Sequence, residues 1–108
     1  MARSNIKVQD VKVLAEGVSS PLSIVQDVRK YQNFAIQVDY DAGLAGNLEL
    51  EASVDGVDYS PIPSSQQAVD PAGGTHIWNV TNAHYLFVRI VIPGTGNISN
   101  VQFVGATV

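Results

Sequence analysis

The chain has 108 residues, a formal net charge of −4 and no cysteine. Its length suits one domain spanning residues 1–108. Six basic residues against ten acidic ones form no basic stripe for phosphates, which argues against binding to nucleic acid or to anionic membranes. The lack of cysteine excludes disulfides, thiolate metal sites and cysteine nucleophiles. Only 15 % of the residues are charged, so we expect a folded chain whose surface is partly covered by a partner.

Apolar and polar residues alternate along most of the chain, which predicts β-strands. The first segment, IKVQDVKVL, changes the parity of its apolar positions near Gln9 and Asp10, and this slip indicates a bulge. Residues 1–13 are expected to form either the first strand or an extended N-terminal arm that pairs with a neighbouring sheet edge. The segment LSIV, residues 22–25, fits a short strand, with a helical turn over 22–32 as the alternative.

The middle of the chain has the most regular alternation. FAIQVDY, residues 34–40, places its aromatic and β-branched residues on one face, which predicts a half-buried antiparallel strand. LELEASV, residues 48–54, repeats the pattern. Asp55-Gly56 follows directly, and it predicts a hairpin turn because glycine supplies the positive φ that such a turn needs.

Three further strands are predicted at THIWNV, YLFVRIVI and ISNVQFVGATV. YLFVRIVI is apolar on both faces apart from Arg89, which predicts a central place in a sheet. Pro93 is expected to end this strand, since proline cannot donate to a ladder. Turn-like clusters separate the segments, among them residues 17–21 and 93–97. The pattern predicts an all-β fold, a single antiparallel β-sandwich of jelly-roll or Greek-key type with about eight strands.

The acidic residues of the middle segment are the first candidates for chemistry. Glu49 and Glu51 project from one face of their strand, opposite the apolar face, so we expect them to be solvated rather than tuned for acid–base catalysis. Asp55 and Asp58 carry oxygens that calcium prefers, but DGVDYSPIP lacks the ligand order of an EF-hand loop. A hairpin turn is the favoured interpretation, and convergence of the two aspartates on an ion stays open.

His76 and His84 are the only histidines, and two histidines without cysteine make a weak zinc site. No GxSxG sequence occurs, and no serine–histidine–aspartate order stands out. We therefore expect no enzyme, no catalytic residue, no metal and no cofactor. A small enzyme, built on these histidines and nearby aspartates, is the least favoured hypothesis.

Three aromatic residues, Tyr59, Trp78 and Tyr85, are candidate ligand or interface residues. Together they could form a platform for stacking sugars. A single tryptophan on a strand belongs more often to a core or an interface, which is the favoured interpretation.

The order of these segments resembles a known class of proteins. FAIQVDY is followed by G-x-L-x-L-E-A-S-V-D-G-x-x-Y-x-x-I-P at residues 46–63, then by HIWNV and Y-x-F-V-R-I. This succession resembles the small β-sandwich accessory virion proteins of tailed bacteriophages. The S-x-D-G element and the Y-x-x-V-R-I strand are also locally similar to discoidin-type sandwiches. The ligand-holding loop residues of discoidin domains have no match in residues 33–92, so that ligand function is not implied.

The resemblance implies a non-enzymatic structural virion protein, such as a capsid decoration (cement) protein or a head–tail accessory protein. Its partners would be major capsid or tail subunits and further copies of itself, and a trimer would suit the role. The N-terminal MARSNIKVQD has no signal-peptide core, so we expect assembly in a host cytoplasm and a final place in the virion. The alternative function is a carbohydrate- or receptor-binding module of a phage tail or fibre, which predicts that some of Tyr59, Trp78 and Tyr85 lie exposed together.

Overall fold

The computed structural model describes residues 8–107, and all seven elements in this part of the chain are β-strands. Their order is β1 (Val8–Asp27), β2 (Asn33–Tyr40), β3 (Asn47–Ser53), β4 (Ser60–Pro61), β5 (Gln67–Ala68), β6 (Gly74–Val80) and β7 (Phe87–Thr107). Every pairing is antiparallel. The predicted all-β class is confirmed, with seven strands in place of about eight.

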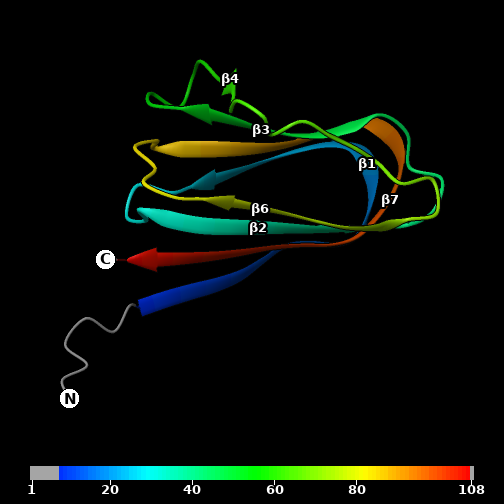
Figure 1. Ribbon diagram of the computed structural model, residues 1–108, viewed down its shortest axis with the longest axis horizontal. Coiled ribbons are helices and arrows are strands. Elements are labelled where there is room, and N and C mark those ends of the chain that lie inside the picture. The colour runs from blue at the N-terminus through cyan, green and yellow to red at the C-terminus, as the bar shows by residue number, and fades with distance from the viewer. Residues whose placement is uncertain (1–7, 108) are drawn as a thin grey trace.

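The two longest strands, β1 and β7, pair with each other along nearly their whole length. The first part of β7 also pairs with β3, and its second part pairs with β2. Both long strands bend at the same end of the molecule (Figure 1), so the sheet curls into a half-barrel. The predicted central position of YLFVRIVI is confirmed. The jelly-roll or Greek-key sandwich stays a prediction, because β1 and β7 cross from one side to the other within one continuous sheet.

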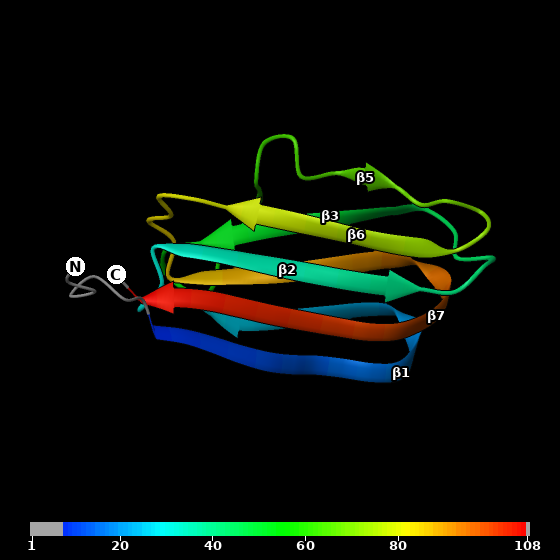
Figure 2. The same ribbon diagram turned by 60° about the horizontal axis from the view of Figure 1, so that its bottom comes forward.

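The curl gives the sheet two limbs that enclose the core between them. The β2 limb contains β6, β2, the second part of β7 and the first part of β1. The β3 limb contains β4, β3, the first part of β7 and the second part of β1. Figure 2 shows the β2 limb from the side, with β6, β2, β7 and β1 next to one another.

The bends lie at the proline and glycine clusters that the sequence marked as turns. Ser20 pairs with Gly96 and Leu22 pairs with Ile92, so one residue of β1 stands against three residues of β7. Pro93 lies within this interruption, where no ladder hydrogen bond is needed, and the prediction that it ends the strand was wrong. A second register shift occurs between Val13 and Ala15, rather than at Gln9 and Asp10 as predicted.

The first described residues of the chain already belong to the sheet. Residues 8–13 form the start of β1, whereas residues 1–7 of the expected strand or arm lie outside the described residues. Residues 22–27 belong to β1 as an extended strand, so the helical alternative for 22–32 was wrong. The described part of the chain contains no helix that is long and apolar enough to cross a membrane.

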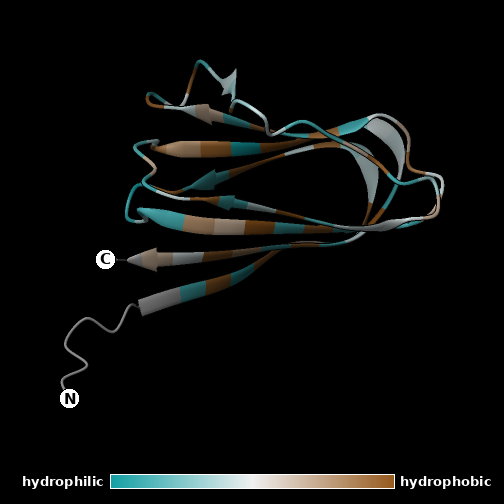
Figure 3. Cartoon of the chain, viewed as in Figure 1, coloured by the Kyte–Doolittle hydropathy of each residue, from teal (hydrophilic) through white to brown (hydrophobic). Residues whose placement is uncertain are grey.

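The core lies between the limbs and is made by the inward positions of each strand. Along β2, buried and half-buried residues alternate strictly, and Figure 3 shows hydrophobic and hydrophilic bands along this strand. Ile36 from the β2 limb and Leu50 and Ile90 from the β3 limb are fully buried. The period-two pattern of the sequence therefore specified which side chains face inward.

Candidate functional site

The Asp55-Gly56 turn after β3 is held by a local network of hydrogen bonds. The Asp55 carboxylate accepts bonds from the backbone N–H groups of Val57 and Asp58 at 2.8 and 2.9 Å. The Ser53 hydroxyl donates to the same carboxylate at 2.8 Å, and its oxygen accepts from the Gly56 N–H. Gly56 has a φ of 79°, as the predicted turn requires. The turn interpretation of this stretch is confirmed.

These contacts give the Asp55 carboxylate a structural role. The N–H donors of Asp58 and Val57 stabilise its charged form and lower its pKa to about 2. Within residues 8–107, no group of three or more histidine, aspartate or glutamate side chains is placed to hold a metal ion. The three bonds from Ser53, Val57 and Asp58 all end on the same carboxylate oxygen, Asp55 Oδ1, so the turn itself engages that atom.

The outer face of the β3 limb carries an ion pair that the sequence analysis did not predict. The Arg89 Nε and Nη2 atoms donate to Glu51 Oε1 at 2.8 and 2.5 Å. The guanidinium lies over the Tyr59 ring, 4.2 Å from its centroid. The Glu51 side chain is only 17 % exposed, so the expectation of a solvated glutamate was wrong at this position. Tyr59 is thereby placed as a cover for an ion pair.

Trp78, the second candidate residue, is buried with 7 % of its surface exposed. Its indole N–H donates to the Ser65 carbonyl at 2.7 Å, which ties β6 to the segment that follows β4. The His76 ring stands edge-on to it at a centroid distance of 4.9 Å. Burial lowers the pKa of His76. The core interpretation of Trp78 agrees with this position, and no open stacking surface is formed by it.

Tyr85, the third candidate, is half-buried beside a different feature. It lines a hollow of about 350 Å³ together with Asp58, the β4 residues Ser60 and Pro61, and Pro63 after β4. The structure therefore places the three aromatic candidates in three separate surroundings. His84 is exposed in the segment between β6 and β7, whereas His76 lies on β6 against Trp78.

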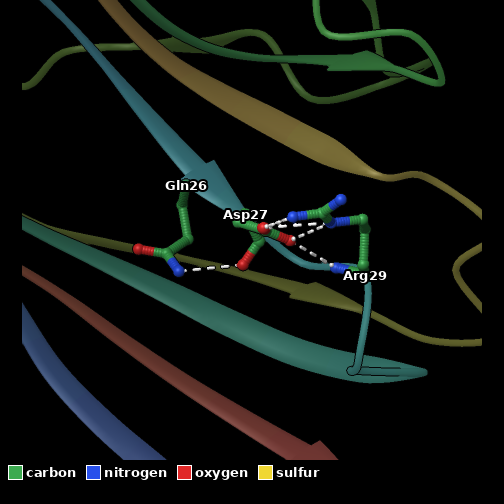
Figure 4. A network of polar contacts seen from close by, with 3 residues as sticks. All are labelled: Gln26, Asp27 and Arg29. Carbon is green, nitrogen blue, oxygen red and sulfur yellow. Dashed lines mark hydrogen bonds and ion pairs between the residues drawn. The ribbon is translucent and has the colours of Figure 1, made fainter.

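A local ion pair lies at the open side of the half-barrel, where the end of β1 comes near Lys12 of its first part. The Arg29 guanidinium donates to the Asp27 carboxylate at 2.6 Å, and the Gln26 amide donates to the Asp27 carbonyl (Figure 4). The hydrogen bonds from Arg29 lower the pKa of Asp27. Both side chains are exposed, so this pair shapes the end of β1 more than it stabilises the fold.

Tyr31 closes the same side of the core from the loop after β1. Its ring packs edge-on against Phe103, and its hydroxyl donates to Asp10 at 2.5 Å. Burial and this hydrogen bond raise the pKa of Tyr31 to about 12. A Cβ on Gly105 would lie 2.5 Å from the Tyr31 ring, so the strand needs glycine at this position.

Sequence reasoning missed one surface that the structure makes visible. Val11, Val13 and Ile77 are exposed by 71, 53 and 55 %, and all three face outward from the β2 limb. The signal was present in VKV, where both outward positions are apolar, and at Ile77, which stands between the outward polar residues Thr75 and Asn79. An exposed apolar surface of this kind suits binding to another protein surface rather than catalysis.

Comparison with known proteins places this fold among solved structures. No protein-family model and no curated protein sequence matches the chain. The SPBc2 prophage-derived protein YomS superposes with a TM-score of 0.71 at 12 % identity, over 94 % of this chain and 96 % of that one. This identity is low enough that the likeness shows the fold alone.

Two further structures are similar at a TM-score of 0.52. One is CBM32-1 from a family 31 glycoside hydrolase of Clostridium perfringens, with 16 % identity over 76 % of this chain and 68 % of that one. The other comes from Bacillus endospore appendages, which form disulfide-linked pili, with 12 % identity over 100 % of this chain and 96 % of that one. The prophage and appendage proteins both match over almost their full length.

Proposed function

We propose that this chain is a non-enzymatic structural component of a tailed-bacteriophage virion, acting as a capsid decoration or head–tail accessory protein. One observation carries the proposal: the fold extends over almost the whole of a prophage-derived protein. The pilus-forming appendage protein, also matched over nearly its whole length, supports an assembly role for this kind of chain.

The mechanism would be the burial of modest surfaces in many symmetric copies. Each contact can be weak, because neighbouring contacts raise the effective concentration of the next one. This chain has no cysteine, so its assembly would rest on non-covalent contacts, unlike the disulfide-linked pili. Its partners would be further copies of the chain and capsid or tail subunits, and it would be assembled in the host cytoplasm.

The carbohydrate- or receptor-binding alternative loses its main support. That function predicts that some of Tyr59, Trp78 and Tyr85 lie exposed together, with Trp78 as its main support, whereas Trp78 is 7 % exposed and Tyr59 stacks on Arg89. The likeness to CBM32-1 therefore supports a shared fold alone.

Particle purification tests the proposal directly. Phage particles from cells that encode this chain are banded on a density gradient and analysed by quantitative mass spectrometry. We expect the chain to band with the particles in a fixed ratio to the major capsid protein. Recovery only from the soluble lysate, with none on intact particles, would overturn the virion role.

A further inference from the structure

β1 is an edge strand, because its only strand partner within residues 8–107 is β7. Figure 2 shows its first part at the rim of the β2 limb, beyond β7. From Val8 to Val13 the pairing with β7 is regular, and a register shift between Val13 and Ala15 ends this run. We name Val8–Val13 the β1 edge segment. Every second residue of it turns its backbone N–H and C=O groups away from β7, where they form a template for a further strand.

The β1 edge segment carries two opposite charges on one face. Asp10 stands opposite Gly105 and Lys12 stands opposite Phe103, and both of these β7 residues are buried. Because directly opposite residues share a face of the sheet, the two charged residues lie on its inner side. Val11, between them, lies on the outer side and is 71 % exposed. The order acid, apolar, base is complementary to itself when a second identical strand runs antiparallel.

Antiparallel pairing of two copies about Val11 would satisfy both charges. In that register Val11 stands opposite Val11 of the second copy, and Asp10 stands opposite its Lys12. The two-fold axis repeats this ion pair, so two pairs form on the inner side while the valines meet on the outer side. A pairing centred on Asp10 or on Lys12 would oppose like charges instead, and the charges therefore select one register.

Both charged groups have capacity for this contact. The Tyr31 hydroxyl and the Lys30 Nζ contact Asp10 at 2.5 and 3.6 Å, and both contacts use Oδ2, which leaves Oδ1 for Lys12 of a second copy. Among the described residues, Lys12 has no ion-pair partner. It lines a hollow of about 410 Å³ in which three cationic side chains stand against one carboxylate. A carboxylate that enters beside Lys12 would therefore meet an excess of positive charge.

We propose that the β1 edge segments of two copies pair antiparallel about a two-fold axis at Val11, which joins the two β2 limbs into one continuous sheet. The charges favour a second copy, because any other strand would need the same acid and base in the reverse order. Backbone hydrogen bonds supply the affinity of strand addition, and the side chains supply its specificity. The inference rests on the assembly role proposed above and names one self-contact of that assembly.

The length of the β1 edge segment sets the strength of the contact. Centred on Val11, the facing residues run from Gln9 to Val13 before the register shift interrupts the strand. So short a contact predicts a reversible dimer that forms as the concentration of the chain rises towards about 1 mM, the effective concentration that linked sites reach in an assembly.

A single introduced thiol tests the register, because the chain has no cysteine of its own. Directly opposite residues of an antiparallel pair have Cα atoms about 4.5–5.5 Å apart, within the range that a disulfide bridges. Val11→Cys places its thiol opposite the same thiol of the second copy. Val13→Cys is the matched control, because Val13 is also exposed on the outer side, by 53 %, but stands opposite Gln9 in the proposed register.

We expect Val11→Cys to form covalent dimers roughly tenfold faster than Val13→Cys under air oxidation at about 1 mM chain, since only the first pair of thiols meets the geometry of a disulfide. Denaturing gel electrophoresis without reductant measures both rates. Equal rates would show collision without a fixed register, and no covalent dimer in either variant would show that the edges do not meet. Either result would overturn the proposal.

Charge reversal identifies the occupant as a second copy. Asp10→Lys and Lys12→Glu each oppose like charges in the dimer, so each should weaken self-association roughly tenfold in sedimentation velocity. A mixture of the two variants should form mixed dimers, because every opposing pair is then attractive. Glu16→Lys is the matched control, since Glu16 is exposed on β1 beyond the register shift. A mixture that stays monomeric, or equal weakening by Glu16→Lys, would contradict the pairing.

Two further measurements keep the outcomes apart. Circular dichroism checks that each variant is folded, and the thiol variants test the contact with both charges in place. An unaltered chain that stays monomeric at about 1 mM but bands with phage particles would overturn the dimer and leave the virion role intact. A dimer that never bands with particles would overturn the virion role and leave the edge contact intact.

Discussion

At the scale of single residues, two acidic side chains of the middle segment, Asp55 and Glu51, make structural contacts. Asp55 binds the N–H groups of its own turn, and Glu51 binds Arg89 across to the neighbouring strand. The bonds to Asp55 lower its pKa, whereas a general acid needs a raised pKa. Polar contacts of this kind fix the ends and the outer side of the β3 limb.

The lowered pKa of Asp55 predicts that the fold loses thermal stability at low pH. Its pKa is 3.8 as a reference value and about 2 in the fold, so its stabilising effect is complete above pH 3.8 and is lost as the pH falls towards 2. Asp55→Asn should flatten the decline of Tm over this range and lower Tm at neutral pH. Thermal melting from pH 2 to pH 7 measures both effects. Asp58→Asn is the control, and an equal change in that variant would contradict the assignment.

The ion pair between Glu51 and Arg89 predicts a measurable coupling energy. A double-mutant cycle with Glu51→Gln and Arg89→Met should give about 1 kcal/mol, near the upper end for surface pairs, because the Glu51 side chain is largely covered. Urea unfolding supplies the four free energies. The exposed Asp27–Arg29 pair serves as the comparison and should couple less. Equal coupling in both pairs would show that covering by Tyr59 adds nothing.

At the scale of elements, the bends of β1 and β7 determine the shape of the molecule. The loop after β2 packs against the bend of β7, where the Ala45 N–H donates to the Thr95 carbonyl at 3.2 Å. A Cβ on Gly94 would overlap the Ala45 carbonyl group. The bend therefore depends on a position where two backbones meet without an intervening side chain.

Gly94→Ala should destabilise the fold by about 1–3 kcal/mol, the usual cost of forcing extra volume into a packed site. Gly74→Ala is the matched control, because a Cβ there meets only the Tyr40 hydroxyl at 3.4 Å. Urea titration of the two variants compares their free energies of unfolding. Equal free energies of unfolding would show that the backbones at Gly94 and Ala45 can move apart without a loss of stability.

The bends also explain what sequence reasoning could and could not determine. The alternation in FAIQVDY specified the inward residues of β2, and Asp55-Gly56 specified its turn, because both depend on local geometry. Pro93 and Pro21 were misread as strand ends, since a bend between two paired strands uses the same residues as a reversal. The partner of Arg89 depends on which strands become neighbours, which no local pattern encodes.

At the scale of the whole molecule, β1 and β7 run through both limbs. We therefore expect the two limbs to unfold together. β7 contributes Ile90 to the β3 limb and Phe103 to the β2 limb, and β1 accompanies it through both. Loosening one limb therefore releases hydrogen bonds along strands that continue into the other. A curled sheet of this kind predicts a single cooperative unfolding unit.

Matched cavities in the two limbs test this coupling. Ile36 and Ile90 are both fully buried, one in each limb, so Ile36→Val and Ile90→Val should each cost about 0.5–1.5 kcal/mol. Urea unfolding should retain one transition with an unchanged slope in both variants. Hydrogen exchange should lose protection by a similar amount throughout β2 and β3, whichever limb carries the cavity, because their slowest amides open only with the whole sheet. Loss confined to the substituted limb would show that the bends act as hinges between independent units.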